Sequence, residues 1–313
     1  MNKKILFAAM DWGIGHATRS VPIIKKLTAE GHQLTLASSG NAFMFWKNYF
    51  PELNVIQKPA YNISYSKKVP ITIGLLFQLP NILSTIRKEK KWLDQLISTE
   101  KFNEVYSDNC YGLNNHKINC TIITHQLMIK CPKPFMFMEP MVHRKILSWL
   151  NKFDNILIPD FEIEENLSGD LSHKYSIPTK AKFIGPQSRF EKINLPMNEK
   201  RYGICALVSG PEPHRSLFEL QSIELIKKSG REGIIVRGLP GEKNVVNING
   251  IEIYNHLRDE ELIEKISQSE KIICRSGYST IMDLYHLGVK AEFYPTPGQT
   301  EQEYLAQHHS RKN

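Results

Sequence analysis

The chain has 313 residues, and 41% of them are hydrophobic, which suffices for two α/β domains with proper cores and excludes a disordered chain. The 40 Lys and Arg residues against 32 Asp and Glu residues give a formal net charge of +8, which favours contact with phosphates, nucleic acid or an anionic membrane surface without choosing among them. The five cysteines are odd in number and widely spaced, so we expect neither a disulfide framework nor a zinc site, and we expect a reducing compartment such as the cytoplasm.

The chain opens with a predicted strand, helix and parallel strand. Residues 5–10 are a short apolar run, apolar residues at helical spacing predict a helix over residues 17–30, and residues 32–38 form the second strand. The first turn has Gly13 and Gly15 but lacks the third glycine of a dinucleotide-binding fingerprint, and no acidic residue closes the second strand. The turn is therefore a poor match to a dinucleotide site.

Further segments extend this first sheet. We expect a long helical region over residues 71–97 with an interruption at Pro80, strands over residues 104–109 and 120–126, and a last strand over residues 155–160. In open α/β sheets ligands sit beyond the carboxyl ends of the strands, so polar side chains at those ends can converge. The side chains at such ends are His16, Asp108 and His125.

A second alternation of strands and helices begins after a polar, proline-containing stretch. We expect a first Rossmann-like domain over residues 1–186, a linker over residues 187–201 and a second Rossmann-like domain over residues 202–313. The second domain's expected strands are residues 202–208, 233–238, 251–256, 271–274 and 291–294, and its expected helices are residues 216–228 and 259–268, one after residue 277 and one from residue 301. The fold class is therefore α/β, with two Rossmann-like domains.

Two strand-to-helix turns near the C-terminus are rich in hydroxyl, amide and carboxylate groups. In the first, residues 275–284, Gly277 lets a ligand approach the backbone, and the free N–H groups of the first helical turn suit a phosphate oxygen. Asp283 lies further along that helix, where its carboxylate can accept hydrogen bonds from sugar hydroxyls. The second turn, residues 295–302, repeats the arrangement one unit later. The pair is typical of a nucleotide-sugar site, and the alternative is two ordinary helix caps.

Four motifs follow one another along the chain. They are residues 11–19 (DWGIGHATR), Ser209 and Gly210, residues 275–284 (RSGYSTIMDL) and residues 297–302 (PGQTEQ). In this order they resemble the MurG-like members of glycosyltransferase family 28 over nearly the whole chain. The resemblance implies the GT-B architecture, in which two Rossmann-like domains face each other across a cleft. It also implies an inverting, metal-independent glycosyltransferase of the hexosyltransferase type, which moves a sugar from a UDP-sugar to an acceptor hydroxyl and needs no cofactor.

An inverting transfer needs a base for the acceptor hydroxyl, and His16 is the candidate because an imidazole titrates near neutral pH and this one lies on the first turn. Asp108 is the candidate that orients His16 and stabilises its imidazolium form. His125 is a second candidate base, and Gly13 and Gly15 complete the expected acceptor side. The alternatives are that His16 hydrogen-bonds its own turn and that Asp108 is a structural cap.

The resemblance assigns the nucleotide-sugar to the C-terminal domain. The expected donor-binding residues are Ser209, Gly210, Arg237, His256, Arg275, Ser276, Gly277, Ser279, Thr280, Asp283, Gln299, Thr300, Glu301 and Gln302. Among them, Arg237 or Arg275 supplies positive charge to the diphosphate, and His256 follows a strand where such enzymes bind the uracil. Glu301 stands where MurG-like enzymes carry a histidine, so N-acetylglucosamine is not implied as the donor sugar. A capped helix start is the alternative interpretation of residues 299–302.

Apolar stretches flanked by basic residues suit the interface of an anionic bilayer. They comprise residues 65–77 with the basic residues 87–92, and residues 133–145. The functional interpretation is a lipid-linked acceptor with peripheral attachment to the inner face of a membrane, and the structural one is a buried helix with a solvated end. No run of 18 apolar residues predicts a transmembrane helix, and Asp11 ends the first apolar run too early for a signal peptide.

Two other functions are compatible with the same fold. A two-domain UDP-sugar 2-epimerase would convert its substrate without an acceptor, and a non-catalytic protein would bind a UDP-sugar without converting it. The chain stops soon after its last motif, whereas GT-B enzymes usually continue into further helices, which keeps the non-catalytic alternative open. Nucleic acid is not an expected partner, because no basic stripe interleaved with aromatic residues is present on one element.

Overall fold

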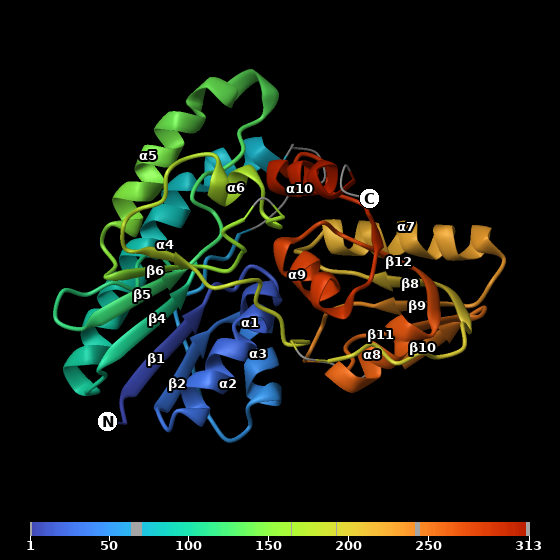
Figure 1. Cartoon of the computed structure of the whole chain (residues 1–313), viewed down its shortest axis with the longest axis horizontal. Coiled ribbons are helices and arrows are strands. Elements are labelled where there is room, and N and C mark those ends of the chain that lie inside the picture. The colour runs from blue at the N-terminus through green and yellow to red at the C-terminus, as the bar shows by residue number, and fades with distance from the viewer. Residues whose placement is uncertain (1, 64–70, 164, 192, 242–244, 311–313) are drawn as a thin grey trace.

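The computed structural model describes every residue except 1, 64–70, 164, 192, 242–244 and 311–313. The described residues form two α/β domains that lie side by side, the N-terminal one running from blue to green and the C-terminal one mostly orange and red (Figure 1). Each domain is built on one sheet, of seven strands in the first and six in the second. The predicted fold class is confirmed.

The N-terminal sheet is parallel throughout and has the strand order β3-β2-β1-β4-β5-β6-β7. Its strands are β1 (Lys4–Ala9), β2 (Gln33–Ser38), β3 (Asn54–Gln57), β4 (Glu104–Asp108), β5 (Asn119–Ile123), β6 (Asn155–Ile158) and β7 (Ala181–Phe183). The order reverses beside β1, whose last residue Ala9 pairs with Asp108 at the end of β4. Ligands of open parallel sheets bind at such a switch point, beyond the carboxyl ends of the two central strands.

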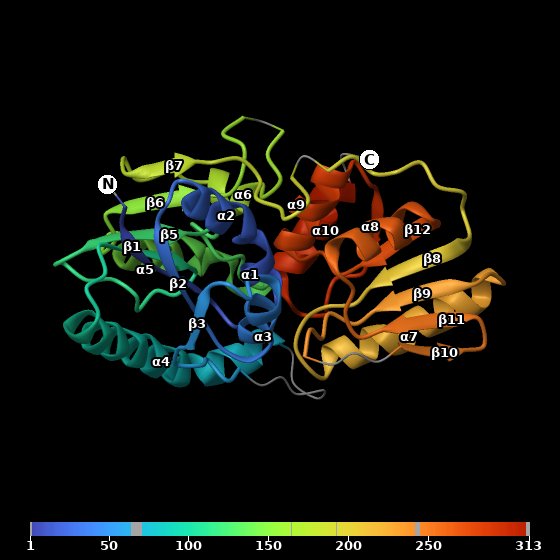
Figure 2. The same cartoon turned by 90° about the horizontal axis from the view of Figure 1, so that it is seen from below.

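Helices cover both faces of this sheet (Figure 2). They are α1 (Gly15–Arg19), α2 (Val21–Ala29), α3 (Gly40–Tyr49), α4 (Ile71–Thr99), the 3-10 helix η1 (Lys133–Met138), α5 (Glu139–Leu150) and α6 (Asp170–His173). Side chains of α2 and α3 pack in one core cluster with Ile5 and Phe7, and those of α4 and α5 pack in another with Leu6 and Ala8. Because successive strand residues point to opposite faces, the single apolar run of β1 supplies both layers of the core.

Three details of this domain differ from the sequence predictions. The helix predicted over residues 17–30 is two helices, because Pro22 has no N–H and cannot continue the hydrogen-bond ladder from α1. The interruption predicted at Pro80 is wrong, since α4 runs through it as one helix, whose residues Ile82 and Ile86 pack on the core and hold it in place. The predicted last strand, β6, is followed at the edge of the sheet by β7, which at three residues is too short to give a pattern.

The C-terminal sheet has the order β10-β11-β9-β8-β12-β13 and is parallel except for β10, which pairs antiparallel with β11. Its strands are β8 (Tyr202–Leu207), β9 (Gly233–Val236), β10 (Val245–Ile248), β11 (Ile251–Tyr254), β12 (Ser269–Cys274) and β13 (Ala291–Phe293), and its helices are α7 (His214–Ser229), α8 (Asp259–Ser267), α9 (Tyr278–Leu287) and α10 (Thr300–Ser310). The order again reverses beside the first strand, between β8 and β12. Ser209 and Gly277 lie in the turns that follow these two strands, at the position expected for a ligand.

The two domains are in direct contact. Leu167 and Leu171 of the N-terminal domain share an apolar cluster with Tyr278, Met282 and Leu305 of the C-terminal domain. Beside this cluster α1 lies next to α9, and the start of α10 lies next to the loop that follows β5 (Figure 2). The carboxyl ends of the two sheets therefore meet at this domain junction.

Candidate active site

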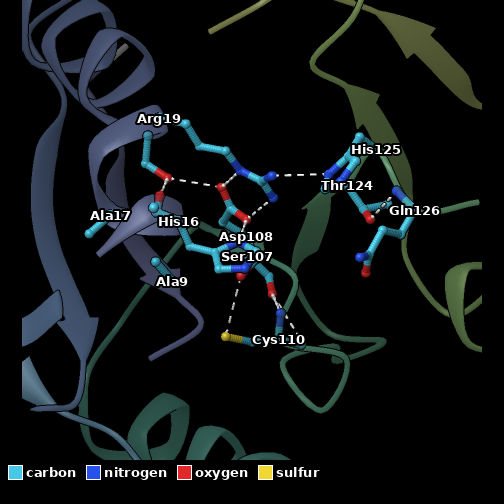
Figure 3. Close-up of polar contacts among 12 residues, drawn as sticks. Ala9, His16, Ala17, Arg19, Ser107, Asp108, Cys110, Thr124, His125 and Gln126 are labelled. Atoms are coloured by element: carbon cyan, nitrogen blue, oxygen red, sulfur yellow. Dashed lines mark hydrogen bonds and ion pairs between the residues drawn. The ribbon is translucent and has the colours of Figure 1, made fainter. Parts of the chain in front are cut away.

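His16 and Asp108 meet at the switch point of the N-terminal sheet. His16 lies on α1, directly after the first turn, and Asp108 is the last residue of β4. Nδ1 of His16 is 2.8 Å from Oδ1 of Asp108 (Figure 3). The side chain of Asp108 is fully buried, whereas that of His16 is 15% exposed. The structure therefore brings together the two residues predicted for catalysis and leaves part of the imidazole accessible.

Arg19 lies one turn after His16 on α1 and holds the carboxylate of Asp108 in two places. Its Nε donates to Oδ2 of Asp108 at 2.7 Å and its Nη2 donates to Oδ1, while Oγ of Ser20 donates to Oδ2 at 3.1 Å. Burial by itself would raise the pKa of Asp108, but the charges of Arg19 and His16 outweigh burial and bring that pKa to about 2. Asp108 is therefore ionised at neutral pH.

His125 connects the N-terminal domain to the C-terminal domain. Its Nδ1 is 3.1 Å from Nη1 of Arg19, and its Nε2 is 3.1 Å from Oε1 of Glu301 at the start of α10. Its ring stacks on that of Tyr278, with the centroids 4.0 Å apart and the planes at 13°. Burial lowers the pKa of His125, the contact with Glu301 opposes this effect, and Arg19 and His16 add to it. The net shift is downward, which favours the neutral imidazole.

Glu301 projects from α10 toward the N-terminal domain. Its carboxylate accepts a hydrogen bond from Nε2 of Gln126 as well as the contact from His125. Burial would raise the pKa of Glu301, but these two contacts outweigh burial and lower it. Thr300 beside it donates through Oγ1 to the backbone carbonyl of Lys130 at 2.6 Å. The start of α10 is thus fastened to the loop that follows β5.

The two glutamines of the same motif make contacts inside the C-terminal domain. Oε1 of Gln299 accepts from the backbone N–H of Gln302 at 2.6 Å, and Oε1 of Gln302 accepts from the N–H of Thr296 at 2.8 Å. Oγ of Ser276 donates to the carbonyl of Gln302 at 2.7 Å. These contacts are those of a capped helix start, the alternative interpretation of this motif.

The start of α9 lies directly against the first turn of the N-terminal domain. A Cβ atom on Gly15 would be 3.0 Å from Oγ of Ser279, closer than side chains normally pack, so a larger residue would force Ser279 to shift. Gly277 precedes α9, and Thr280 lies in its first turn, where the backbone amides have no acceptor within the helix. The groups predicted to hold a diphosphate therefore border the same junction as His16.

The two arginines predicted to supply charge are engaged by other groups. Arg275 is buried and donates to three backbone carbonyls, and burial lowers its pKa to about 10. Arg237 follows β9 and contacts Glu219 with Nη2 at 2.6 Å and Nε at 3.0 Å, and its Nη1 donates to Oδ1 of Asn255 at 3.0 Å. Among the described residues, no group of three or more His, Cys, Asp and Glu side chains is arranged to hold a metal ion.

The two residues predicted to contact the nucleoside lie around Arg189 of the linker. Oγ of Ser188 donates to Oδ1 of Asp283 at 2.5 Å, and burial raises the pKa of Asp283 to about 6 against the opposing charge of Arg189. Burial, aided by Arg189, lowers the pKa of His256 to about 4, and its ring meets Phe45 of α3 edge-on with centroids 6.0 Å apart. Asp283 and His256, predicted for the ribose and the base, therefore both lie within electrostatic reach of Arg189.

Arg19, Gln126 and Tyr278 belong to this cluster but were not among the predicted site residues. Arg19 carried an available signal, because it follows His16 by three positions and so lies on the same face of a helix. Gln126 and Tyr278 carried none, since their partners come from the other domain.

Comparisons with known proteins agree with the fold. An uncharacterized glycosyltransferase of Methanosarcina mazei is 22% identical over 96% of this chain and 81% of its own. The solved structure of the glycotransferase of kitacinnamycin matches with a TM-score of 0.64 at 13% identity, over 98% of this chain and 84% of its own. The spinosyn rhamnosyltransferase SpnG, complexed with thymidine diphosphate, matches with a TM-score of 0.63 at 12% identity, over 98% of this chain and 85% of its own. No family model matches the chain. The chain therefore has the GT-B fold, as predicted.

Proposed function

We propose that this protein is an inverting, metal-independent glycosyltransferase that moves a sugar from a UDP-sugar to an acceptor hydroxyl. The observation that carries the proposal is the His16–Asp108 pair, which lies at the domain junction beside Glu301 and the start of α9. The likeness to glycosyltransferases, one of them bound to thymidine diphosphate, supports a nucleotide-sugar donor. The resemblance of the four motifs to MurG-like family 28 enzymes is the reason for choosing uridine as the nucleoside.

His16 acts as the base in this proposal. The ionised Asp108 accepts the Nδ1–H of His16, which leaves the lone pair of Nε2 to take the proton of the acceptor hydroxyl. The hydroxyl oxygen then attacks the anomeric carbon from the face opposite the diphosphate, so the configuration at that carbon inverts. Asp108 stabilises the imidazolium that forms.

The leaving diphosphate is held by backbone groups in this proposal. The unpaired amides at the start of α9 and the positive end of the helix dipole suit a phosphate, and the hydroxyls of Ser279 and Thr280 lie in the same turn. Gly210, in the turn after β8, has a φ of 97°, which glycine adopts more readily than other residues. Such preorganised donors stabilise the charge that develops on the leaving group without a metal ion.

Glu301 contacts the sugar in this proposal, and it does so by exchanging partners. In the structure its carboxylate accepts from His125 and Gln126 of the N-terminal domain. Sugar hydroxyls are equivalent donors, so a bound donor sugar would replace one or both of these side chains. Because the carboxylate of Glu301 only accepts hydrogen bonds, it favours a sugar that presents hydroxyl groups over one that presents an acceptor such as an acetamido carbonyl.

A thermal-shift panel of UDP-glucose, UDP-galactose, UDP-N-acetylglucosamine and dTDP-glucose tests the donor, because a ligand of the folded state raises the melting temperature. We expect at least one UDP-sugar to raise it, and the Glu301→Ala variant to reduce the shift. If no UDP compound changes the melting temperature, the proposal fails. Incubation of the donor without an acceptor separates transfer from epimerisation, since a 2-epimerase would produce the epimer under those conditions.

We further propose that the acceptor is lipid-linked and is met at an anionic membrane. Phe135, Met136 and Phe137 of η1 and Met141 of α5 have exposed fractions of 46%, 50%, 78% and 58%. We call these four residues the apolar ridge, and Figure 1 shows their segment, in green above α5, at the outer edge of the N-terminal domain. Lys133 at its start also lines, with α10, a cavity of about 530 Å³. An apolar projection with a cation at its base suits a headgroup interface.

The ridge carries this proposal better than the other predicted stretch. Residues 65–70, including Lys67 and Lys68, lie outside the described residues. Lys90 donates to Asp94 and to the carbonyl of Asn114, each at 2.7 Å, so its charge is already engaged. No helix in the described part of the chain is long and apolar enough to cross a bilayer.

A further inference from the structure

Arg19 contacts Asp108, the partner of His16, and also His125, and its hydrogen-bonding chemistry decides which ring nitrogens carry protons. A guanidinium donates from every nitrogen and accepts at none, so any atom that bonds to it is an acceptor. Nη1 of Arg19 lies 3.1 Å from Nδ1 of His125. That ring nitrogen therefore carries a lone pair, and the proton of neutral His125 is on Nε2.

The contact on the other side of His125 requires the same arrangement. Nε2 lies 3.1 Å from Oε1 of Glu301, whose lowered pKa keeps it an acceptor at neutral pH. A doubly protonated ring would direct an N–H at the N–H of Arg19, and burial together with the charge of Arg19 lowers the pKa of His125. Neutral His125 therefore accepts a hydrogen bond from Arg19 at Nδ1 and donates one to Glu301 from Nε2.

Arg19 requires the opposite arrangement in His16. Through Nε and Nη2 it donates to both oxygens of Asp108, which keeps that carboxylate ionised and acceptor-only. Nδ1 of His16, 2.8 Å from Oδ1 of Asp108, must then carry the proton. Figure 3 shows the guanidinium between Asp108 and His125, and the side chain of Arg19 is only 2% exposed.

We propose that Arg19 is a positioning residue that sets opposite tautomers in the two histidines, so that His16 presents a basic Nε2 and His125 presents an Nε2–H donor at the domain junction. The catalytic use of the lone pair on His16 rests on the proposed function, whereas the tautomers do not. When a donor sugar engages Glu301, the N–H of His125 becomes available to an oxygen of that sugar.

Other ionisable groups face this cluster from the neighbouring elements. Tyr111 after β4 and Tyr278 of α9 have pKa values raised by burial, as does Cys110. Asp108 and Glu301 have lowered pKa values. These groups keep one protonation state near neutral pH, so the proton positions that the experiment must determine are those of the two imidazoles.

Long-range ¹H–¹⁵N spectra of the full chain with ¹⁵N-labelled histidine test the proposal without any substrate. The chemical shifts show which ring nitrogen carries the proton, and His16→Asn and His125→Asn variants assign the signals. We expect His16 protonated on Nδ1 and His125 protonated on Nε2 near neutral pH. A His125 that is doubly protonated or protonated on Nδ1 overturns the proposal, whether or not the protein proves to be a glycosyltransferase.

The Arg19→Met variant tests whether Arg19 is the cause. Without the guanidinium, nothing requires a lone pair on Nδ1 of His125, and Asp108 loses two of its donors, so we expect at least one of the two histidines to become a mixture of tautomers. The matched control is Arg231→Met, which removes an arginine paired with Glu270 in the C-terminal domain and should leave both histidines unchanged. Unchanged tautomers of both histidines in a folded Arg19→Met protein contradict the proposal.

The Arg19→Lys variant decides the matter if Arg19→Met does not fold. Lysine keeps the charge, but one ammonium cannot reproduce the fork that reaches Asp108 and His125 together. We expect at least one of the two histidines to become a mixture of tautomers. If both tautomers stay as in the unmodified protein, the guanidinium does not set them.

Discussion

At the scale of single residues, Asp283 is a carboxyl group whose ionisation is opposed by the fold. Burial raises its pKa from 3.8 to about 6, so the unfolded chain loses this proton more readily than the folded one. Asp283 therefore contributes fully to the stability of the folded protein below the pKa that it has in the unfolded chain. This contribution is lost as the pH rises through the pKa that it has in the folded protein. A buried carboxyl group with a raised pKa is typical of a binding site.

The Asp283→Asn variant should therefore be more stable than the unmodified protein above the folded pKa. Asparagine still accepts from Ser188 but carries no charge, so the free energy of unfolding should rise by on the order of 1–3 kcal/mol near pH 8 and change little below about pH 4. Urea unfolding at the two pH values measures this difference. An equal effect at both would mean that ionisation is not the cause. If Asp283 also binds ribose, the same variant should bind UDP more weakly.

The His16→Ala variant tests the proposed base. Because general base catalysis typically contributes about 10²–10⁴-fold, kcat should fall by at least about 100-fold while the KM for the donor stays nearly constant. Steady-state kinetics with the donor found in the thermal-shift panel measure both constants. His116→Ala is the control, since His116 is exposed in the loop before β5. A His16→Ala enzyme with normal kcat would remove His16 from the mechanism.

The residues of the site differ in how far the sequence could predict them. His16 and Asp108 were predictable because one lies on the turn after a predicted strand and the other at the end of a predicted strand, and the strands of a parallel sheet end at one edge. The contacts of His125 with Arg19 and Glu301 were not, because they join residues 106 and 176 positions apart. No local pattern encodes a pair whose members come from separate elements, and the second pair also depends on how the domains meet.

At the element scale, the approach of α1 to α9 depends on the missing side chain of Gly15. The Gly15→Val variant would force its branches toward Ser279 and push the two elements apart, with an expected loss of about 1–3 kcal/mol in the free energy of unfolding and weaker donor binding. Calorimetry of unfolding and of nucleotide binding measures both effects. The control is Gly241→Val, because a Cβ there meets nothing within 4 Å. Equal behaviour of the two variants would show that the close approach is unimportant.

Two prolines show why helix boundaries were only partly predictable. Pro22 separates α1 from α2, whereas Pro80 lies inside α4 without ending it. The local chemistry is the same in both cases, since each proline lacks an N–H. The difference is tertiary, because the part of α4 that follows Pro80 packs on the core through Ile82 and Ile86. β3 and β10 were missed for a simpler reason: neither strand has a buried residue, whereas the equally short β9, which was predicted, is buried throughout.

At the scale of the whole molecule, polar contacts on separate elements hold the domains in one orientation. The hydroxyl of Tyr49 on α3 donates to Asp259 on α8 at 2.7 Å. The hydroxyl of Tyr304 on α10 accepts from the backbone N–H of Asp170 on α6, also at 2.7 Å. Together with the contacts of Glu301, they fasten the junction on more than one side.

The apolar ridge gives a prediction at this scale. Replacement of Phe135 and Phe137 by serine removes most of its exposed aromatic surface, so sedimentation with vesicles containing anionic lipid should fall several-fold. Leu220→Ser is the control, because Leu220 is 61% exposed on α7 of the other domain. Vesicles of phosphatidylcholine alone should retain little of either protein. Unchanged sedimentation of the ridge variant would rule out membrane attachment through this surface.

The bond between Tyr49 and Asp259 joins the two domains directly, so it opposes their separation. Under the proposed function a nucleotide-sugar enters between the domains, so opening of the junction limits how fast it binds. Departure of the spent nucleotide is gated by the same event. Tyr49→Phe should therefore quicken capture and release together in stopped-flow traces, and a change in release alone would locate the gate elsewhere. The rate at which the two domains separate then sets the upper limit on kcat.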